Sequence, residues 1–172
     1  MYAINEENKM SLNVILSKDL VFIQKDFSSA MEVIKFLSEQ LLEKSYVKDD
    51  FLNAVLKREE KAPTGLYLGG LNVAIPHADA QYVLKSSIAI AILKKPVQFK
   101  QMDNPSKEIP VYLVFLIATD GSSGRVKFLS KLASAFGDQS FVKSLYYSQT
   151  SEDVINLLSK VIIDEKETSI PR

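Results

Sequence analysis

The sequence has no cysteine, no tryptophan and only one histidine, His77, among its 172 residues. The lack of cysteine excludes disulfides, zinc–thiolate sites, iron–sulfur clusters and thiol nucleophiles. A single histidine excludes any metal site with several histidine ligands, and a catalytic triad would have to be built around His77. The chemistry open to this chain is therefore narrow, and most of it would involve one imidazole.

A net charge and long apolar segments are also missing. The 21 basic and 21 acidic side chains cancel, so no excess of positive charge supports nucleic-acid binding. The longest apolar runs, Ile88–Leu93 and Val111–Ala118, are far shorter than the ~18 residues of a membrane span. The N-terminal residues lack the basic start and apolar core of a signal peptide. We expect a cytoplasmic protein that neither inserts into a membrane nor binds nucleic acid.

The apolar runs predict the strands. Ile88–Leu93 and Val111–Ile117 are nearly continuous, which is typical of central strands covered on both faces. Shorter strands are predicted at Leu20–Ile23, at Val73–Ile75 and, on a sheet edge after Pro96, at Val97–Phe99. The polar segment Gln101–Pro110 is predicted to be a loop.

Helical spacing predicts helices between and after these strands. The first begins at a capping box of Ser29 and Glu32, and the second begins near Asp49 and ends at Arg58–Glu60. The helix after the Gly-Ser-Ser-Gly loop ends at Gly137 and is predicted to bury Val126, Leu129, Leu132, Ala133 and Phe136. Gln139–Leu145 and a segment from about Thr150 to Asp164 complete the set.

These interleaved elements predict one α/β domain. We expect a sandwich with a mixed, mostly parallel sheet and helices on both faces. Residues 11–163 are expected to form the folded core of a single domain of residues 1–172, with short polar tails at both ends.

His77 follows a glycine-rich segment and stands directly after Pro76. The proline fixes its own backbone and favours an extended Ile75, so the imidazole is expected on a rigid junction at the carboxyl end of a strand. Functional groups gather at this end of strands in open α/β folds. The imidazole can be a structural residue, a general base, or a nucleophile that attacks phosphorus.

A phosphorylated imidazole needs cations or amide donors, because the phosphoryl group brings nearly two negative charges. Only three arginines are present; Arg58 ends the second predicted helix, and Arg125 opens the helix after the Gly-Ser loop. Both can hold phosphate or be solvated surface charges. Glu59 can hold the tautomer of the imidazole or be solvated, and Thr64 can bind phosphate or cap a turn. No Gly-Lys-Ser/Thr sequence completes a Walker A loop, which argues against an ATP-dependent kinase.

The string Arg58–Gly65 (REEKAPTG), followed by Val73–His77 (VAIPH), resembles enzyme IIA domains of the fructose/mannitol family. These domains belong to the bacterial phosphoenolpyruvate-dependent sugar phosphotransferase system. The resemblance extends from about Leu20 to Ile163. Lys85–Ser87, together with the Pro-Thr-Gly and Ala-Ile-Pro-His strings, is most similar to the galactitol-type branch.

The resemblance implies a phosphocarrier. His77 corresponds to the residue that receives a phosphoryl group from the protein HPr and passes it to a cysteine of an enzyme IIB partner. A membrane enzyme IIC then takes up the sugar or polyol as it is phosphorylated. Arg58 corresponds to the family arginine that neutralises the phosphoryl group, and Glu59 and Thr64 lie in the same motif. The scheme requires no metal and no other cofactor.

One position departs from the mannitol and fructose pattern. There, a second active-site histidine begins the helix after the last central strand, whereas this chain has Arg125; galactitol-type proteins also lack that histidine. Arg125 can stabilise phosphate by its charge, but an arginine stays protonated in a protein and cannot shuttle a proton.

Two other functions stay open. One is a regulatory binding module of the nitrogen-related branch, with phosphorylation of His77 as the switch; the other is a structural homologue that no longer transfers phosphate. HPr and enzyme IIB would both have to reach His77, so we expect an exposed apolar patch around it, with Tyr67, Leu68 and Tyr82 as candidates.

Overall fold

The computed structural model describes the backbone of residues 14–121 and 123–168, and the side chains of these residues except 123–125 and 162–168. In chain order the elements are the 3-10 helix η1 (Lys18–Leu20), β1 (Val21–Lys25), α2 (Ala30–Glu43), α3 (Phe51–Lys61), β2 (Gly65–Leu66), β3 (Asn72–Ala74), the 3-10 helix η2 (Ala80–Tyr82), β4 (Ser87–Gln101), β5 (Asn104–Ala118), α4 (Ser123–Phe136), α5 (Gln139–Tyr146) and α6 (Ser151–Thr168). Within these ranges, no helix has both the length and the apolar character needed to cross a membrane.

The strands form one five-stranded mixed sheet in the order β1-β4-β2-β3-β5, and β4 also pairs with β5. Three of the five pairings are parallel: β1–β4, β2–β4 and β3–β5. The longest ladder is the antiparallel β4–β5 hairpin. The predicted mixed sheet is therefore confirmed.

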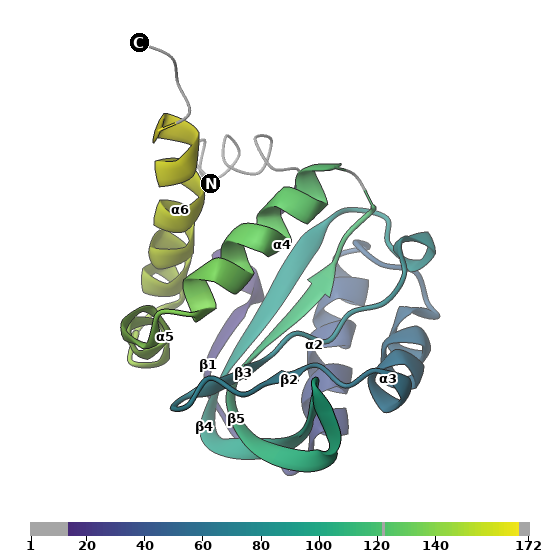
Figure 1. The fold of residues 1–172 in the computed structure, drawn as a ribbon. Coiled ribbons are helices and arrows are strands. Elements are labelled where there is room, and N and C mark those ends of the chain that lie inside the picture. The colour runs from purple at the N-terminus through teal and green to yellow at the C-terminus, as the bar shows by residue number, and fades with distance from the viewer. Residues whose placement is uncertain (1–13, 122, 169–172) are drawn as a thin grey trace.

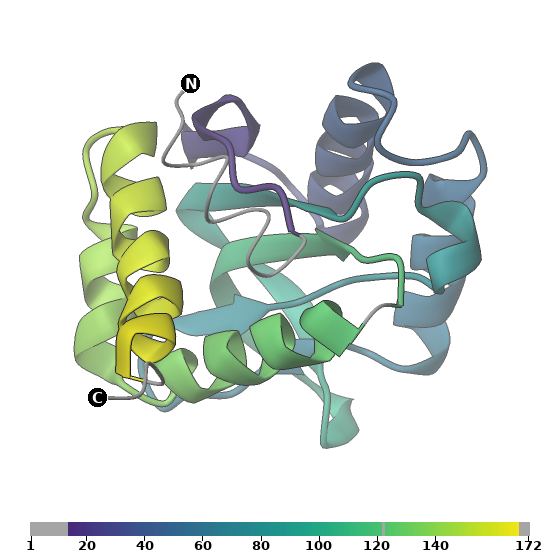
Figure 2. The same ribbon diagram turned by 90° about the horizontal axis from the view of Figure 1, so that it is seen from above.

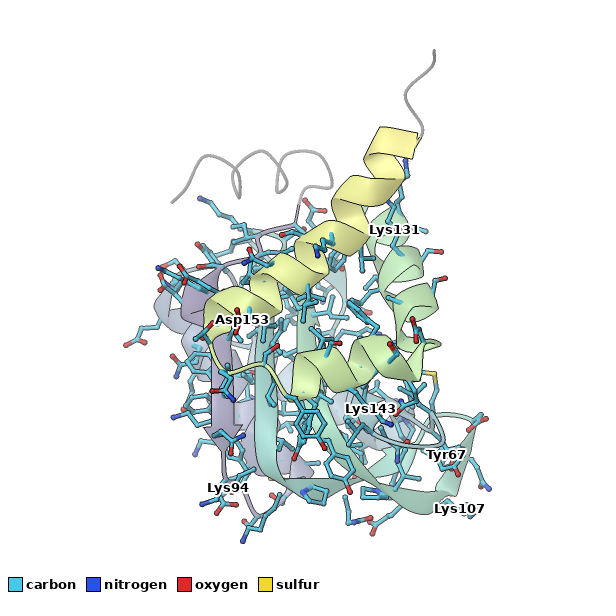
Figure 3. All side chains as sticks on the ribbon, turned by 90° about the vertical axis from the view of Figure 1, so that its left-hand side faces the viewer. Tyr67, Lys94, Lys107, Lys131, Lys143 and Asp153 are labelled. Atoms are coloured by element: carbon cyan, nitrogen blue, oxygen red, sulfur yellow. The ribbon has the colours of Figure 1, made fainter. Side chains whose placement is uncertain are left out.

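Helices cover both faces of this sheet, as the sequence predicted. The helices α2 and α3 form one layer, and α4, α5 and α6 form the other (Figure 1 and Figure 2). Figure 3 looks onto the second layer, where Lys143 on α5 and Asp153 on α6 are exposed.

Successive residues of β4 face opposite layers, which explains its continuous apolar run. Ala89, Ala91 and Leu93 belong to the core on the α2–α3 side, and Ile88, Ile90 and Ile92 to the core on the other side. The helices fill the two cores mainly with Val33, Leu37, Phe51 and Val55 on the first side and with Phe128, Leu132, Phe136, Val142, Leu145, Val154 and Leu158 on the second.

The predicted loop at Gln101–Pro110 is wrong. Asn104–Pro110 is the first half of β5, and Val97–Phe99 belongs to the continuous strand β4. The register of the hairpin shifts between Ile92 and Val97, where the exposed Lys94–Pro96 interrupts the apolar run. Beyond that irregularity, Val97–Gln101 of β4 keeps an alternating burial pattern, but every residue from Asn104 to Glu108 of β5 is exposed. The alternation that marks a half-buried strand is therefore missing from this part of β5.

The ends of the helices follow the predicted signals with small shifts. The Ser29 Oγ accepts a hydrogen bond from the Glu32 N–H at 3.2 Å, as the capping box predicts. The Glu32 carboxylate accepts from the N–H of Ser28 instead of Ser29, at 2.7 Å. The N-cap of α3 is Asp50, not Asp49, and its side chain makes no capping hydrogen bond. At the other end of the chain, α6 continues past Asp164 to Thr168.

The predicted buried face of α4 is partly wrong. Leu132 and Phe136 are buried as predicted, but Val126 is 58% exposed and Ala133 is exposed too. Phe128, which the pattern did not select, is buried. Phe128, Leu132 and Phe136 lie four residues apart and form the stripe that contacts the sheet.

A Ser38→Ala variant is expected to be more stable than the wild type by about 1 kcal/mol. Ser38 lies inside α2, is 3% exposed, and its Oγ has no hydrogen-bond partner among the described residues. Alanine removes a buried unsatisfied hydroxyl and has the higher helix propensity. Urea unfolding measures the difference. Ser144→Ala is the control, because that exposed Oγ donates to Ser140 O at 3.0 Å; an equal gain in both variants would contradict the explanation from burial.

Candidate functional site

His77 lies just beyond the carboxyl end of β3, as predicted. The parallel pairing of β3 with β5 continues through an isolated bridge between His77 and Ile117. The carbonyl of Pro76 accepts a hydrogen bond from the Ile117 N–H at 3.0 Å. The backbone that carries the imidazole is therefore part of the sheet and not a free loop.

The His77 ring has a defined backbone partner. Its Nδ1 lies 2.8 Å from the carbonyl oxygen of Ile75. A carbonyl only accepts hydrogen bonds, so Nδ1 must be the N–H donor in this contact. In the neutral ring the lone pair then resides on Nε2.

The ring borders a pocket of about 370 Å³ between the sheet and α4. Ile75 and Ile117 line it from the sheet side, and Val126, Leu129 and Ala133 line it from α4. The exposed apolar residues Val126 and Ala133 of α4 therefore line the same pocket as the histidine, together with the partly buried Leu129. Among the predicted patch residues, Tyr67 is 63% exposed, whereas Tyr82 packs partly buried against the core on the α2–α3 side.

Arg58 comes close to the histidine segment through an ion pair. Its Nη1 lies 3.7 Å from Oδ1 of Asp79, two residues after His77, and both side chains are substantially exposed, at 43% and 73%. Asp79 stands at the N-cap of η2, but its side chain makes no capping hydrogen bond there. Such an exposed pair adds little stability, so the guanidinium can exchange this partner for another anion at low cost.

Glu59 and Thr64 bind each other. The Glu59 carboxylate accepts from the Thr64 N–H at 3.0 Å and from the Thr64 Oγ1–H at 2.8 Å. Burial raises the pKa of Glu59, because loss of hydration outweighs the hydrogen bonds from Thr64 and the nearby charge of Arg58. The neighbouring Glu60 is exposed, as expected.

Two sequence hypotheses about these residues are corrected. The acceptor at Nδ1 of His77 is the Ile75 carbonyl and not Glu59. Thr64 is only 2% exposed and its hydroxyl donates to Glu59, so it does not present this group to a phosphate. Arg125 lies in the first turn of α4, and its side chain lies outside the described residues.

Sequence reasoning did not select Asn72 and Gln139, which support the segment before the histidine. Asn72 Oδ1 accepts from the Leu68 N–H at 2.8 Å, and its Nδ2 donates to Pro110 O at 2.9 Å. Gln139 Oε1 accepts from the Leu71 N–H at 3.0 Å. An asparagine beside Gly69-Gly70 is a turn signal, whereas the contact of Gln139 is long-range and leaves no local signal.

Comparisons with known proteins show the family of the chain and its fold. The family model described as "Phosphoenolpyruvate-dependent sugar phosphotransferase system, EIIA 2" matches residues 14–161. The multiphosphoryl transfer protein of Shigella flexneri is 30% identical over 146 residues, which are 84% of this chain and 17% of that protein. The chain thus spans less than a fifth of the length of this relative.

Solved structures of the same fold include the complex of enzyme IIA-Mtl with phosphorylated enzyme IIB-Mtl from Escherichia coli, with a TM-score of 0.70 and 24% identity over 85% of this chain and 98% of that chain. The nitrogen regulatory protein IIA-Ntr of Neisseria meningitidis has a TM-score of 0.67 and 22% identity, over 87% of this chain and 98% of that chain. At these identities the likeness establishes the fold.

Proposed function

The chain belongs to the EIIA type-2 family of the phosphoenolpyruvate-dependent sugar phosphotransferase system, and we propose that it is a cytoplasmic phosphocarrier acting through His77. It accepts a phosphoryl group from phospho-HPr and passes it to a cysteine of an enzyme IIB partner. A membrane enzyme IIC of the same system then takes up a sugar or polyol, of the galactitol type. The observation that carries the proposal is the contact of His77 Nδ1 with the Ile75 carbonyl, which puts the ring proton on Nδ1 and the lone pair on Nε2.

The transfer is an in-line displacement. The Nε2 lone pair of neutral His77 forms the new N–P bond while the P–N bond to the histidine of HPr breaks, and the HPr histidine leaves with that electron pair. The proton stays on Nδ1 of His77 throughout, hydrogen-bonded to the Ile75 carbonyl. Transfer to the cysteine of enzyme IIB repeats the displacement, with the thiolate as nucleophile and Nε2 as leaving atom. Positioning and charge stabilisation supply most of the catalysis.

Charge stabilisation falls to Arg58. The incoming phosphoryl group brings nearly two negative charges, and the guanidinium exchanges the Asp79 carboxylate for the phosphoryl oxygens. Arg125, in the first turn of α4, is the second candidate for binding phosphate by its charge, and an arginine moves no proton. Glu59 and Thr64 support the site indirectly. Through the contact of Thr64 with Ile75, they hold the backbone segment before His77 in place.

Replacement of Arg58 tests this role. Arg58→Ala is expected to slow phosphoryl acceptance about 10²-fold, the effect of losing one donor to a transition-state anion. Arg58→Lys is expected to recover part of the rate, because it keeps the charge and loses the two-pronged contact. Rapid-quench transfer from labelled phospho-HPr measures both. Lys57→Ala, the exposed neighbour on α3, is the control; an equal loss there would show a general charge effect.

The function itself is tested by reconstitution. Incubation with phosphoenolpyruvate, enzyme I and HPr should add one acid-labile phosphoryl group, seen by intact mass. Addition of enzyme IIB should then move that group to the partner's cysteine. Phosphorylation without onward transfer would favour regulatory output, and no phosphorylation beside a competent EIIA control would overturn the proposal.

A further inference from the structure

The carbonyl that orients the imidazole is itself held by a second strand. Gly65 pairs with Ala74 and Leu66 with Val73 in the antiparallel ladder of β2 and β3. The Ile75 N–H donates to the carbonyl of Thr64 at 3.2 Å, which extends this register by one residue. Ile75 therefore contacts both residues: its N–H donates to the Thr64 carbonyl, and its carbonyl accepts from Nδ1 of His77.

Thr64 is in turn fixed by α3. Its N–H and its Oγ1–H both donate to the carboxylate of Glu59, at 3.0 Å and 2.8 Å. Glu59 lies near the end of α3, which closes with a hydrogen bond from the Ala62 N–H to the Arg58 carbonyl at 2.6 Å. A continuous series of hydrogen bonds therefore runs from Glu59 through Thr64 and Ile75 to Nδ1 of His77.

The position of Glu59 is costly, which argues against an incidental contact. Its side chain is partly buried, and this burial is the largest influence on its pKa, which it raises. Glu60, the next residue, is exposed and takes no part in the series. A carboxylate is well suited here because it offers two acceptor oxygens to the two donors of Thr64.

We propose that Glu59 is a positioning residue, which fixes the Nδ1–H tautomer and the orientation of His77 through Thr64 and the Ile75 backbone. The role deepens the phosphocarrier function and rests on it only where the rate of transfer is concerned. Without Glu59, the Thr64 segment loses its anchor and the Ile75 carbonyl moves relative to the ring. The ring proton then redistributes between the two nitrogens, and the Nε2 lone pair is lost from part of the population.

The tautomer can be read directly, because the chain has one histidine. Labelling with [15N]histidine reports His77 alone, at a pH well above about 6.5, the ordinary pKa of imidazole. In the wild type the two ring nitrogens should give well-separated 15N shifts, with Nδ1 protonated and Nε2 not. In Glu59→Ala the two shifts should move toward each other, and phosphoryl acceptance should fall about tenfold.

Glu59→Gln is the conservative variant. Its Oε1 can accept from the Thr64 N–H while its Nε2–H donates to Thr64 Oγ1, so both contacts survive without the charge. It should keep the wild-type 15N shifts and most of the rate, and Glu60→Gln should match the wild type. The dispersion of the amide-proton signals in a one-dimensional 1H spectrum of each sample shows that each variant is folded.

The possible outcomes are distinct. Wild-type 15N shifts in Glu59→Ala, or equal changes in Glu59→Gln and Glu59→Ala, would overturn the positioning role. If the shifts change as expected but the wild type accepts no phosphoryl group, the phosphocarrier function fails and the positioning role stands. If the wild type is phosphorylated and the shifts in Glu59→Ala are unchanged, the phosphocarrier function stands and the positioning role fails.

Discussion

A His77→Ala variant should accept no phosphoryl group from phospho-HPr, which is the largest effect expected of any substitution in this chain. The chain has no second histidine and no cysteine, so neither side chain is present to take over as nucleophile. Loss of a covalent nucleophile removes the reaction path itself, whereas loss of Arg58 only raises its barrier. Intact mass after incubation with phosphoenolpyruvate, enzyme I and HPr measures the result.

The same variant should remain folded. Alanine removes the contact of Nδ1 with the Ile75 carbonyl, while the Pro76–Ile117 hydrogen bond is made by the backbone and survives. We expect a loss of about 1 kcal/mol in unfolding free energy, the typical value of one hydrogen bond. Ser130→Ala, at the pocket wall, is the matched control and should be phosphorylated normally. An acid-labile phosphoryl group on folded His77→Ala would be incompatible with the proposed mechanism.

A Gly65→Ala variant should lose about 2 kcal/mol of stability through overpacking. A Cβ at Gly65 would stand 2.6 Å from the backbone oxygen of Lys100 and 3.3 Å from Ile109 Cδ1. This is where β2 pairs with β4, through Gly65 and Gln101 and a hydrogen bond from the Met102 N–H to the Gly65 carbonyl at 2.8 Å. Because a backbone atom blocks the methyl group, β2 must move away from β4.

That movement should also reach the histidine. Gly65 follows Thr64, whose carbonyl accepts a hydrogen bond from the Ile75 N–H. Displacement of β2 should therefore shift the Ile75 carbonyl, which accepts from the His77 ring. We expect a melting temperature lower by about 4–8 °C and slower phosphoryl acceptance. Gly69→Ala is the control: Gly69 has φ +82° and open space around it, so the variant should lose about 1 kcal/mol by backbone strain and keep its rate. Normal stability of Gly65→Ala would refute the close approach of the two strands.

The strand segments that the sequence predicted most clearly are the ones buried on both faces. Ile88–Leu93 and Val111–Ile117 are apolar on both faces because two helical layers cover them, and this burial is what the pattern records. In the outer half of the β4–β5 hairpin, Val97 and Phe99 of β4 are buried, whereas every residue from Asn104 to Glu108 of β5 is exposed. No apolar alternation therefore distinguishes Asn104–Pro110 from a loop. Its extended conformation comes from pairing with β4, which is a tertiary contact.

The sequence indicated which candidate residues lie near one another, but it did not indicate the contacts between them. Val126 was assigned to the core because an apolar residue at helical spacing looks the same whether it meets the sheet or lines the pocket of His77. Likewise, the motif put Glu59, Thr64 and His77 in one neighbourhood but could not show that a backbone carbonyl stands between them. That arrangement depends on the register of β2 against β3, which the local sequence does not encode.

The bridge between His77 and Ile117 has a consequence for biosynthesis. His77 is synthesised before β5, the strand that pairs with the backbone around it. Ile117, the residue that pairs with His77, leaves the ribosome considerably later. Until Ile117 is available, Pro76 lacks its partner and β3 has only the two residues of β2 beside it. Under the proposed function, the nascent chain contains the nucleophile well before the sheet that positions it is complete, and phosphorylation of His77 must await the synthesis of β5.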